Sequence, residues 1–364
     1  MKLRLSAAVG LLATTSGLLS AQQGAYIDQN AVSSMTMVSD TRVGAGVGID
    51  NPLYLKTPGA GGPLANYVNL WFNRVGGGLS ACTGTMLNSR QILTAAHCVS
   101  NGVSLTSNSF TARFRTGSGN GPGDWFSVSG STYAVRDGYS GAIIEERDVA
   151  VLTLDTDAPG FATGESISQN SPFTKSTIGG YGRYGVIGDP NASLSDQFSD
   201  AARVRTGFQL FETSCNTSGF CAGTGNADPF GFGGVLLADA DLSGASANGF
   251  TCAALGFCTA GYAGFEEVGI NRGDSGSAAF DADGNIIGVA SWGSISDPGS
   301  RIPIGGNIGY ACVANYAGNQ ACQANYQWIQ RQLISQVPEP GSLALLGLGL
   351  AGLAAARRRR AIAA

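Results

Sequence analysis

From Tyr67 onward, the chain alternates short apolar runs with clusters of Gly, Ser, Asn and Asp. Runs of about four to eight residues rich in Val, Ile, Tyr, Phe and Trp, bounded by turn residues, are typical of strands. The pattern therefore predicts an all-β barrel or sandwich. The expected strands are residues 67–72, 84–87, 91–94, 112–115, 148–154, 176–182, 203–206 and 285–292.

One segment near the carboxyl end has a helical pattern instead. In residues 323–336, the side chains of Tyr326, Ile329, Leu333 and Ile334 fall on one face. We expect a carboxyl-terminal helix here that packs against the second half of the fold.

The amino-terminal region has a different composition. Lys2 and Arg4 precede an apolar run over residues 5–19, which predicts a secretory signal peptide at residues 1–21. Residues 22–62 are polar and contain a Gly/Pro-rich patch, so we interpret them as an amino-terminal extension or pro-segment.

The carboxyl end, residues 337–364, combines Pro-Glu-Pro, an apolar run over 342–356 and four arginines at 357–360. The run is shorter than the ~20 residues of a full span, and the arginines would stay cytoplasmic. It predicts a hydrophobic helix, in the plainest reading a short permanent anchor. The order of elements also resembles a PEP-CTERM sorting signal. That resemblance implies export in a Gram-negative bacterium, transient inner-membrane anchoring, removal of the tail by an exosortase-type enzyme, and a final place at the cell surface or in the extracellular matrix.

Composition excludes two classes. Hydrophobic residues make up 43% of the chain, which is too many for a disordered protein. The formal charge is −4, but six of the 21 cations lie in the terminal segments, which leaves −10 for the rest. An acidic body argues against nucleic acid as a partner.

Two segments carry candidate chemistry. The single histidine, His97, follows the apolar residues 92–96, and Ser275 lies between glycines in the sequence GDSGS. A serine hydroxyl needs a neighbouring base to become a nucleophile, and imidazole is suited to that task near neutral pH. Asp148 opens an apolar run, so we prefer it over Asp155 and Asp157 as the residue that orients the histidine.

In chain order, segments 82–87, 92–98, 148–152, 273–277 and 291–293 resemble the trypsin/chymotrypsin-like serine endopeptidases. The resemblance covers about residues 65–336. It implies a domain at 63–336 built of two packed six-stranded antiparallel β-barrels, with the site in the cleft between them.

The resemblance also implies roles. Ser275 is the expected nucleophile, His97 the general base and Asp148 its orienting acid. The backbone N–H groups of Gly273 and Ser275 are the expected oxyanion hole. Cys82 and Cys98 match the disulfide that holds the histidine loop.

Substrate preference and activation follow from the same resemblance. Gly269 is expected at the base of the primary pocket, and Ser291, Trp292 and Gly293 are expected to line it. Glycine at the base of the pocket favours a substrate with a neutral side chain. Glu266 and Glu267 could still reach the pocket if the loop that carries them has another shape. Cleavage after Arg42 could create an amino terminus that pairs with Asp274. Asn271 and Ser277 depart from the family pattern.

Export makes the eight cysteines potential disulfides. Cys312 and Cys322 form one expected pair. Four others form a weak repeat whose pairing can be local or crossed: Cys215, Cys221, Cys252 and Cys258. We expect no metal site. The spacing of these cysteines does not suit zinc. Residues 281–285 resemble the start of a calcium loop, but its twelfth position is Trp292 and not an acid, and Asp283-Gly284 fits a hairpin turn better.

We therefore expect a secreted or surface-anchored serine endopeptidase that acts on proteins or peptides through an acyl-enzyme and needs no cofactor. The alternative is a catalytically silent matrix-binding protein that keeps the protease fold. A third possibility is hydrolysis of non-peptide esters.

Overall fold

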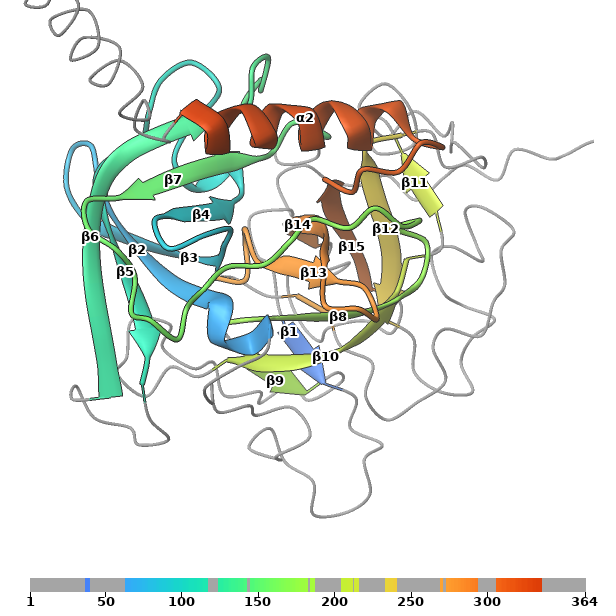
Figure 1. Ribbon diagram of the computed structural model, residues 1–364, viewed down its shortest axis with the longest axis horizontal. Coiled ribbons are helices and arrows are strands. Elements are labelled where there is room, and N and C mark those ends of the chain that lie inside the picture. The colour runs from blue at the N-terminus through green and yellow to red at the C-terminus, as the bar shows by residue number, and fades with distance from the viewer. Residues whose placement is uncertain are drawn as a thin grey trace, which may run out of the picture.

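The computed structural model describes residues 37–39, 63–116, 124–142, 145–182, 184–186, 204–211, 213–215, 233–240, 269–270, 273–293 and 306–335. The predicted signal peptide, most of the extension and the carboxyl-terminal tail lie outside these ranges. Two groups of strands lie side by side, and α2 (Gln320–Ser335) runs along one edge of both (Figure 1).

The first group is a closed antiparallel barrel in the order β2-β3-β4-β7-β6-β5. Its strands are β2 (Tyr67–Arg74), β3 (Leu79–Met86), β4 (Gln91–Thr94), β5 (Ser107–Arg115), β6 (Trp125–Val135) and β7 (Ala150–Leu154). Aromatic rings fill its interior. Phe110 packs against Phe72 and Tyr133, and its ring occupies the space where a Cβ on Gly130 would lie.

The second group is one antiparallel sheet in the order β10-β8-β13-β14-β15-β12-β11. Its strands are β8 (Lys175–Gly180), β10 (Arg205–Leu210), β11 (Thr213–Cys215), β12 (Val235–Ala240), β13 (Ala278–Phe280), β14 (Ile286–Gly293) and β15 (Gly306–Cys312). Because β10 also contacts β12, the six strands from β10 to β12 curl into a second barrel with β11 at its edge. The predicted fold of two six-stranded antiparallel barrels with a carboxyl-terminal helix is confirmed.

Among the described residues, four short elements lie outside the barrels. The 3₁₀ helices are η2 (Pro63–Asn66) before β2 and η3 (Ala96–Cys98) after β4. Strand β1 (Met37–Ser39) pairs in parallel with β9 (Tyr184–Val186). The predicted extension therefore contributes one strand that its sequence pattern does not indicate.

The carboxyl-terminal helix begins earlier than predicted and connects both halves of the molecule. The Asn325 side chain is buried and donates to the carbonyl oxygens of Glu146 and Cys312 at 2.7 and 2.9 Å. Glu146 belongs to the loop before β7 and Cys312 ends β15. The helix thus ties the first barrel to the second.

Two disulfides agree with prediction. Cys82 in β3 is bonded to Cys98 in η3, and Cys312 is bonded to Cys322 in α2. The pairing of the other four cysteines lies outside the described contacts.

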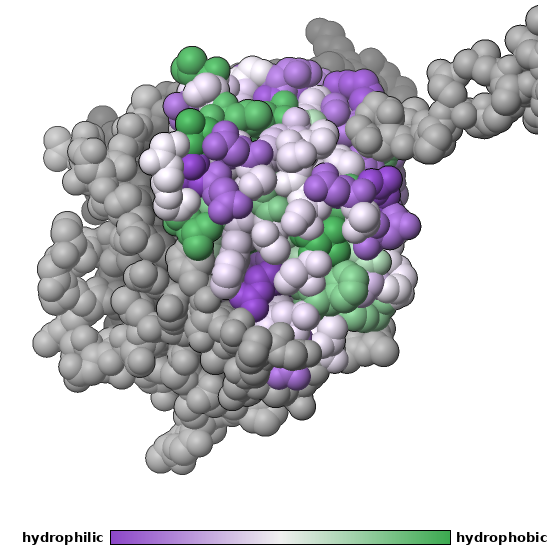
Figure 2. Space-filling view, turned by 90° about the vertical axis from the view of Figure 1, so that its left-hand side faces the viewer, coloured by the Kyte–Doolittle hydropathy of each residue, from purple (hydrophilic) through white to green (hydrophobic). Residues whose placement is uncertain are grey.

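Figure 2 shows the outer face of the first barrel, where hydrophilic and hydrophobic side chains are interspersed. Among the described residues, the exposed large hydrophobic side chains are Val75, Leu79, Val103, Leu105 and Phe126. Single exposed apolar side chains are normal on a protein surface.

Candidate active site

His97 is placed by a short turn between the barrels. Strand β4 ends at Thr94, and η3 follows at once, held to β3 by the Cys82–Cys98 disulfide. The His97 side chain keeps 18% of its surface exposed, so one edge of the ring stays accessible.

Asp148 lies two residues before β7 and is fully buried. Its Oδ1 accepts the backbone N–H of His97 at 2.8 Å, and its Oδ2 lies 2.6 Å from His97 Nδ1. Because an ionised carboxylate only accepts hydrogen bonds, this contact favours the tautomer with the proton on Nδ1. The other ring nitrogen, Nε2, is then a proton acceptor.

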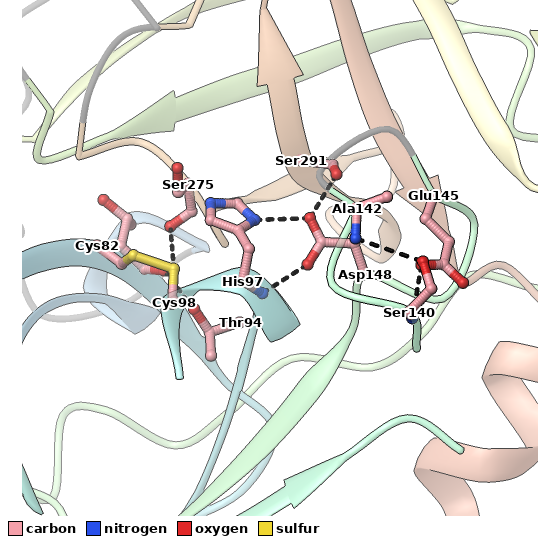
Figure 3. Close-up of polar contacts among 11 residues, drawn as sticks. Cys82, Thr94, His97, Cys98, Ser140, Ala142, Glu145, Asp148, Ser275 and Ser291 are labelled. Carbon is pink, nitrogen blue, oxygen red and sulfur yellow. Dashed lines mark hydrogen bonds and ion pairs between the residues drawn. A yellow bond between two sulfur atoms is a disulfide. The ribbon is translucent and has the colours of Figure 1, made fainter. Parts of the chain in front are cut away.

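The loop that carries Asp148 is braced from within. The backbone N–H and hydroxyl of Ser140 donate to Glu145 Oε2 at 2.9 and 2.7 Å (Figure 3). Glu145 is itself buried, and Asn325 of α2 holds the next residue, Glu146, by its carbonyl. A buried charge needs such hydrogen bonds to remain buried, so these contacts keep the Asp148 loop in place.

Ser275 sits in the turn before β13, and the turn is bonded to both barrels. The Ser275 carbonyl accepts the N–H of Thr83 in β3 at 2.9 Å, and the N–H of Gly276 donates to Ala290 in β14 at 2.8 Å. Cys98 Sγ lies 3.7 Å from the same carbonyl, so the disulfide packs against this turn. Figure 3 places Ser275 on the side of the His97 ring that faces away from Asp148.

Glycine is required at position 276. Its φ is +85°, and an added Cβ would lie 2.0 Å from Thr94 Oγ1 and 2.5 Å from the Thr83 carbonyl. We expect Gly276→Ala to lower the free energy of unfolding by about 3 kcal/mol or more, because backbone strain and a clash with main chain add together. Urea unfolding would measure the loss.

Gly77→Ala is the matched control, because Gly77 has φ +100° but nothing within 4 Å of an added Cβ. It carries the conformational cost alone, about 1–2 kcal/mol. Equal losses in the two variants would show that the contact with Thr83 and Thr94 is unimportant.

Asp274, beside Ser275, is fully buried, and its Oδ1 accepts the N–H of Gly182 at 2.8 Å. A Cβ on Gly180 would lie 2.2 Å from the same oxygen, so glycine lets the chain approach the carboxylate. Burial and then the Asp274 charge raise the pKa of Tyr310, which therefore stays neutral. The suggested partner of Asp274, an amino terminus at Val43, lies outside the described residues.

Ser291 has a role that the sequence analysis did not identify. Besides its expected place in the substrate pocket, its hydroxyl donates to Asp148 Oδ2 at 2.5 Å from a fully buried position. The sequence carries no signal for this contact, because it depends on where β14 passes the Asp148 loop. Asp148 thus accepts from three donors.

Ser291→Ala removes one of those donors. We expect kcat/KM to fall by about 10- to 100-fold, because a hydrogen bond to a charged group is worth about 1.5–3 kcal/mol. Steady-state kinetics on a peptide substrate would measure it. Ser176→Ala is the control, since that buried hydroxyl donates to the neutral Thr174 carbonyl. An equally large loss of kcat/KM in Ser176→Ala would contradict a specific role of the Ser291 hydrogen bond to Asp148.

The other residues expected to form the pocket lie close to the hydrophobic core of the second barrel. Gly269 is buried, and Trp292 is fully buried against Gly309 of β15. Gly293 pairs with Ile308 across the sheet. Glu266, Glu267 and Asn271 lie outside the described residues.

Two possible metal positions are occupied by other bonds. Ligand atoms of Cys82, His97 and Cys98 come within 4.8 Å of one another, but both sulfurs are in the disulfide and offer no thiolate. Asp281 accepts from the N–H groups of Asp283 and Asn285 and from the Ser168 hydroxyl. Residues 281–285 therefore form the predicted hairpin turn between β13 and β14.

Comparison with known proteins identifies the family of the chain. The Trypsin family model matches residues 68–255, just over half of the chain, and the PEP-CTERM protein-sorting motif matches residues 336–360. No curated protein sequence matches. Among solved structures, the crystal structure of the protease Anisep from Arthrobacter nicotinovorans is similar, with 13% identity and a TM-score of 0.43. That match covers 75% of this chain and 96% of the other. With its two barrels and its matching sequence, the chain belongs to the trypsin family and carries a PEP-CTERM sorting motif.

Proposed function

We propose that this protein is a serine endopeptidase whose nucleophile, general base and orienting acid are Ser275, His97 and Asp148. One observation carries the proposal: the buried Asp148 holds His97 at Nδ1, while Ser275 lies at the opposite side of the ring. In this proposal, Nε2 faces the hydroxyl that it deprotonates.

In the proposed reaction, Ser275 Oγ attacks the scissile carbonyl carbon as its proton passes to His97 Nε2. Asp148 stabilises the resulting imidazolium, and the N–H groups of Gly273 and Ser275 stabilise the oxyanion. His97 then gives its proton to the leaving amine, which leaves an acyl group on Ser275. Water, deprotonated by His97, hydrolyses that ester and restores the enzyme. These residues need no cofactor for this chemistry.

The proposed location of the protein rests on features at the two ends of the chain. We propose export through a signal peptide at 1–21, a transient inner-membrane helix within 337–364, and removal of that tail by an exosortase-type enzyme at the surface of a Gram-negative bacterium. The sorting motif supports this route. Within the part of the chain that the structure describes, no helix is long and apolar enough to cross a membrane.

For specificity, we propose a neutral substrate side chain in a pocket formed by Gly269, Ser291, Trp292 and Gly293, since none of these carries a charge. For activation, we propose that cleavage after Arg42 creates an amino terminus at Val43 that pairs with Asp274.

A fluorophosphonate probe tests the central claim, because it bonds only to an activated serine. We expect an adduct on Ser275, located by mass spectrometry, that disappears in His97→Ala. Folded protein that stays unlabelled even after limited proteolysis near Arg42 would refute the proposal and favour a silent protease-fold binding protein. A panel of peptide and ester substrates separates peptidase from esterase activity.

A further inference from the structure

A cavity of about 330 Å³ lies where the connection between the barrels passes α2. Its walls are formed by Leu87, Gly164, Glu165, Ser166, Ile167, Gln169, Tyr326, Gln330 and Leu333. The connection is bonded to both barrels here: the Glu165 N–H donates to the carbonyl of Met86 at the end of β3, and the Ser168 N–H donates to the carbonyl of Ile286 in β14. The cavity thus belongs to the seam between the two halves, and its size is at the lower end of the range for small-molecule sites, about 300–1,000 Å³.

Glu165 is held in this cavity by a buried amide. Asn66, only 3% exposed, donates from Nδ2 to Glu165 Oε1 at 2.6 Å, and its Oδ1 accepts the N–H of Gly164 at 3.0 Å. No lysine or arginine of the described residues forms an ion pair with Glu165. Burial raises the pKa of this carboxyl group, against the opposing effect of the Asn66 hydrogen bond. The Asn66 hydrogen bond orients the carboxyl group, and within the described residues no ion pair offsets its charge.

The surroundings favour a cation with an apolar body. Leu87, Ile167 and Leu333 contribute apolar side chains to walls that are otherwise largely polar. Gln330 and Leu333 belong to the last two turns of α2, and its final turn carries no basic residue. The carboxyl-terminal end of a helix has a partial negative charge, which adds to that of Glu165.

We propose that this cavity is a binding site for a primary alkylammonium group, with the ammonium on Glu165 and the carbon chain against Leu87, Ile167 and Leu333. Asn66 already donates to Oε1, so Oε2 is the oxygen of Glu165 that accepts no other hydrogen bond within the described residues. A guanidinium is bound best by two oxygens, whereas an ammonium is a compact point charge that one oxygen can hold. A single carboxylate is also too few ligands for calcium, which takes six to eight oxygens.

The ligand can be a free alkylamine or the lysine side chain of a polypeptide, since both present the same group. The test uses the full-length chain and isothermal titration with n-pentylammonium chloride, Nα-acetyl-lysine N-methylamide and the neutral analogue 1-pentanol. We expect saturable binding of both cations, a rise in Tm on binding, and no saturation with 1-pentanol. Tighter binding of the lysine derivative assigns the site to a polypeptide, and tighter binding of pentylammonium to a small amine.

Glu165→Gln keeps the shape of the side chain and an acceptor for Asn66 but removes the charge. We expect it to weaken binding of the cations at least about tenfold, as for other charge-assisted contacts. Asp157→Asn is the matched control: it removes an acid from the same connection, where the side chain is 71% exposed, and should change affinity less than about twofold. Equal affinity in Glu165→Gln and the unaltered chain, or no saturable binding, would overturn the proposal.

A pH series gives a second readout. The ammonium binds the ionised carboxylate, so affinity is full above the pKa of Glu165 and falls as pH drops through it. Because burial raises that pKa, the fall should begin at a higher pH than for an ordinary glutamate. Affinity that does not change with pH would contradict the site. The readout is binding, so the result is independent of whether Ser275 is catalytic.

Discussion

Replacing Ser275 with alanine should lower kcat for peptide hydrolysis by about 10⁶-fold, the loss found when the nucleophile of a serine protease is removed. Without the Ser275 hydroxyl no acyl-enzyme can form. The backbone N–H donors of the turn remain, so only substrate binding and oxyanion stabilisation persist. Hydrolysis of a fluorogenic peptide would measure the loss, and circular dichroism would verify that the variant folds.

Ser277→Ala is the control for this experiment. Ser277 lies two residues further along the chain and is fully buried. Because its hydroxyl forms no hydrogen bond with the residues that the structure describes, its removal should change stability by about 1 kcal/mol or less and leave hydrolysis and fluorophosphonate labelling in place. Turnover that survives in Ser275→Ala and is lost in Ser277→Ala would exclude Ser275 as the nucleophile.

Asp148→Asn should lower kcat by about 10⁴-fold while the fold stays intact. The carboxylate accepts from the His97 backbone, from His97 Nδ1 and from Ser291. An asparagine has one acceptor oxygen and an amide group that donates, so it cannot accept from all three groups. If the amide faces His97, the ring proton moves to Nε2, and the ring can no longer take the proton of Ser275. Kinetics and nitrogen NMR of the single histidine would report both effects.

Asp155→Asn is the matched comparison, because Asp155 follows the same strand but is exposed to solvent. Its loss should leave kcat within about twofold, as for most surface substitutions. Similar losses in the two variants would mean that Asp148 acts on stability and not on the histidine tautomer.

Strands differ in whether their apolar residues form an uninterrupted run that can be seen in the sequence. Strands β2, β4, β7 and β14 are runs of apolar side chains, so their pattern is visible locally. Strand β6 was missed because serines and Gly130 interrupt it, and Gly130 is there to admit the Phe110 ring of the neighbouring strand. Strand β15 contains Gly309, which gives space to Trp292 in the same way. A glycine that makes room for an aromatic ring on a neighbouring strand cannot be recognised from the residues next to it in the sequence.

The sequence by itself determined the candidate chemistry: one histidine, one serine between glycines, an aspartate before an apolar run, and their order along the chain. It also determined the class of fold, through short strands separated by turns. Only the tertiary structure decided that Ser291 donates to Asp148, that Asn325 joins the barrels, and that Asn66 holds Glu165 in the seam. Each of these contacts joins residues at least 13 positions apart in the chain, and most join residues about 100 or more apart. Strand register and helix docking place such partners together, and neither is written in the neighbouring residues.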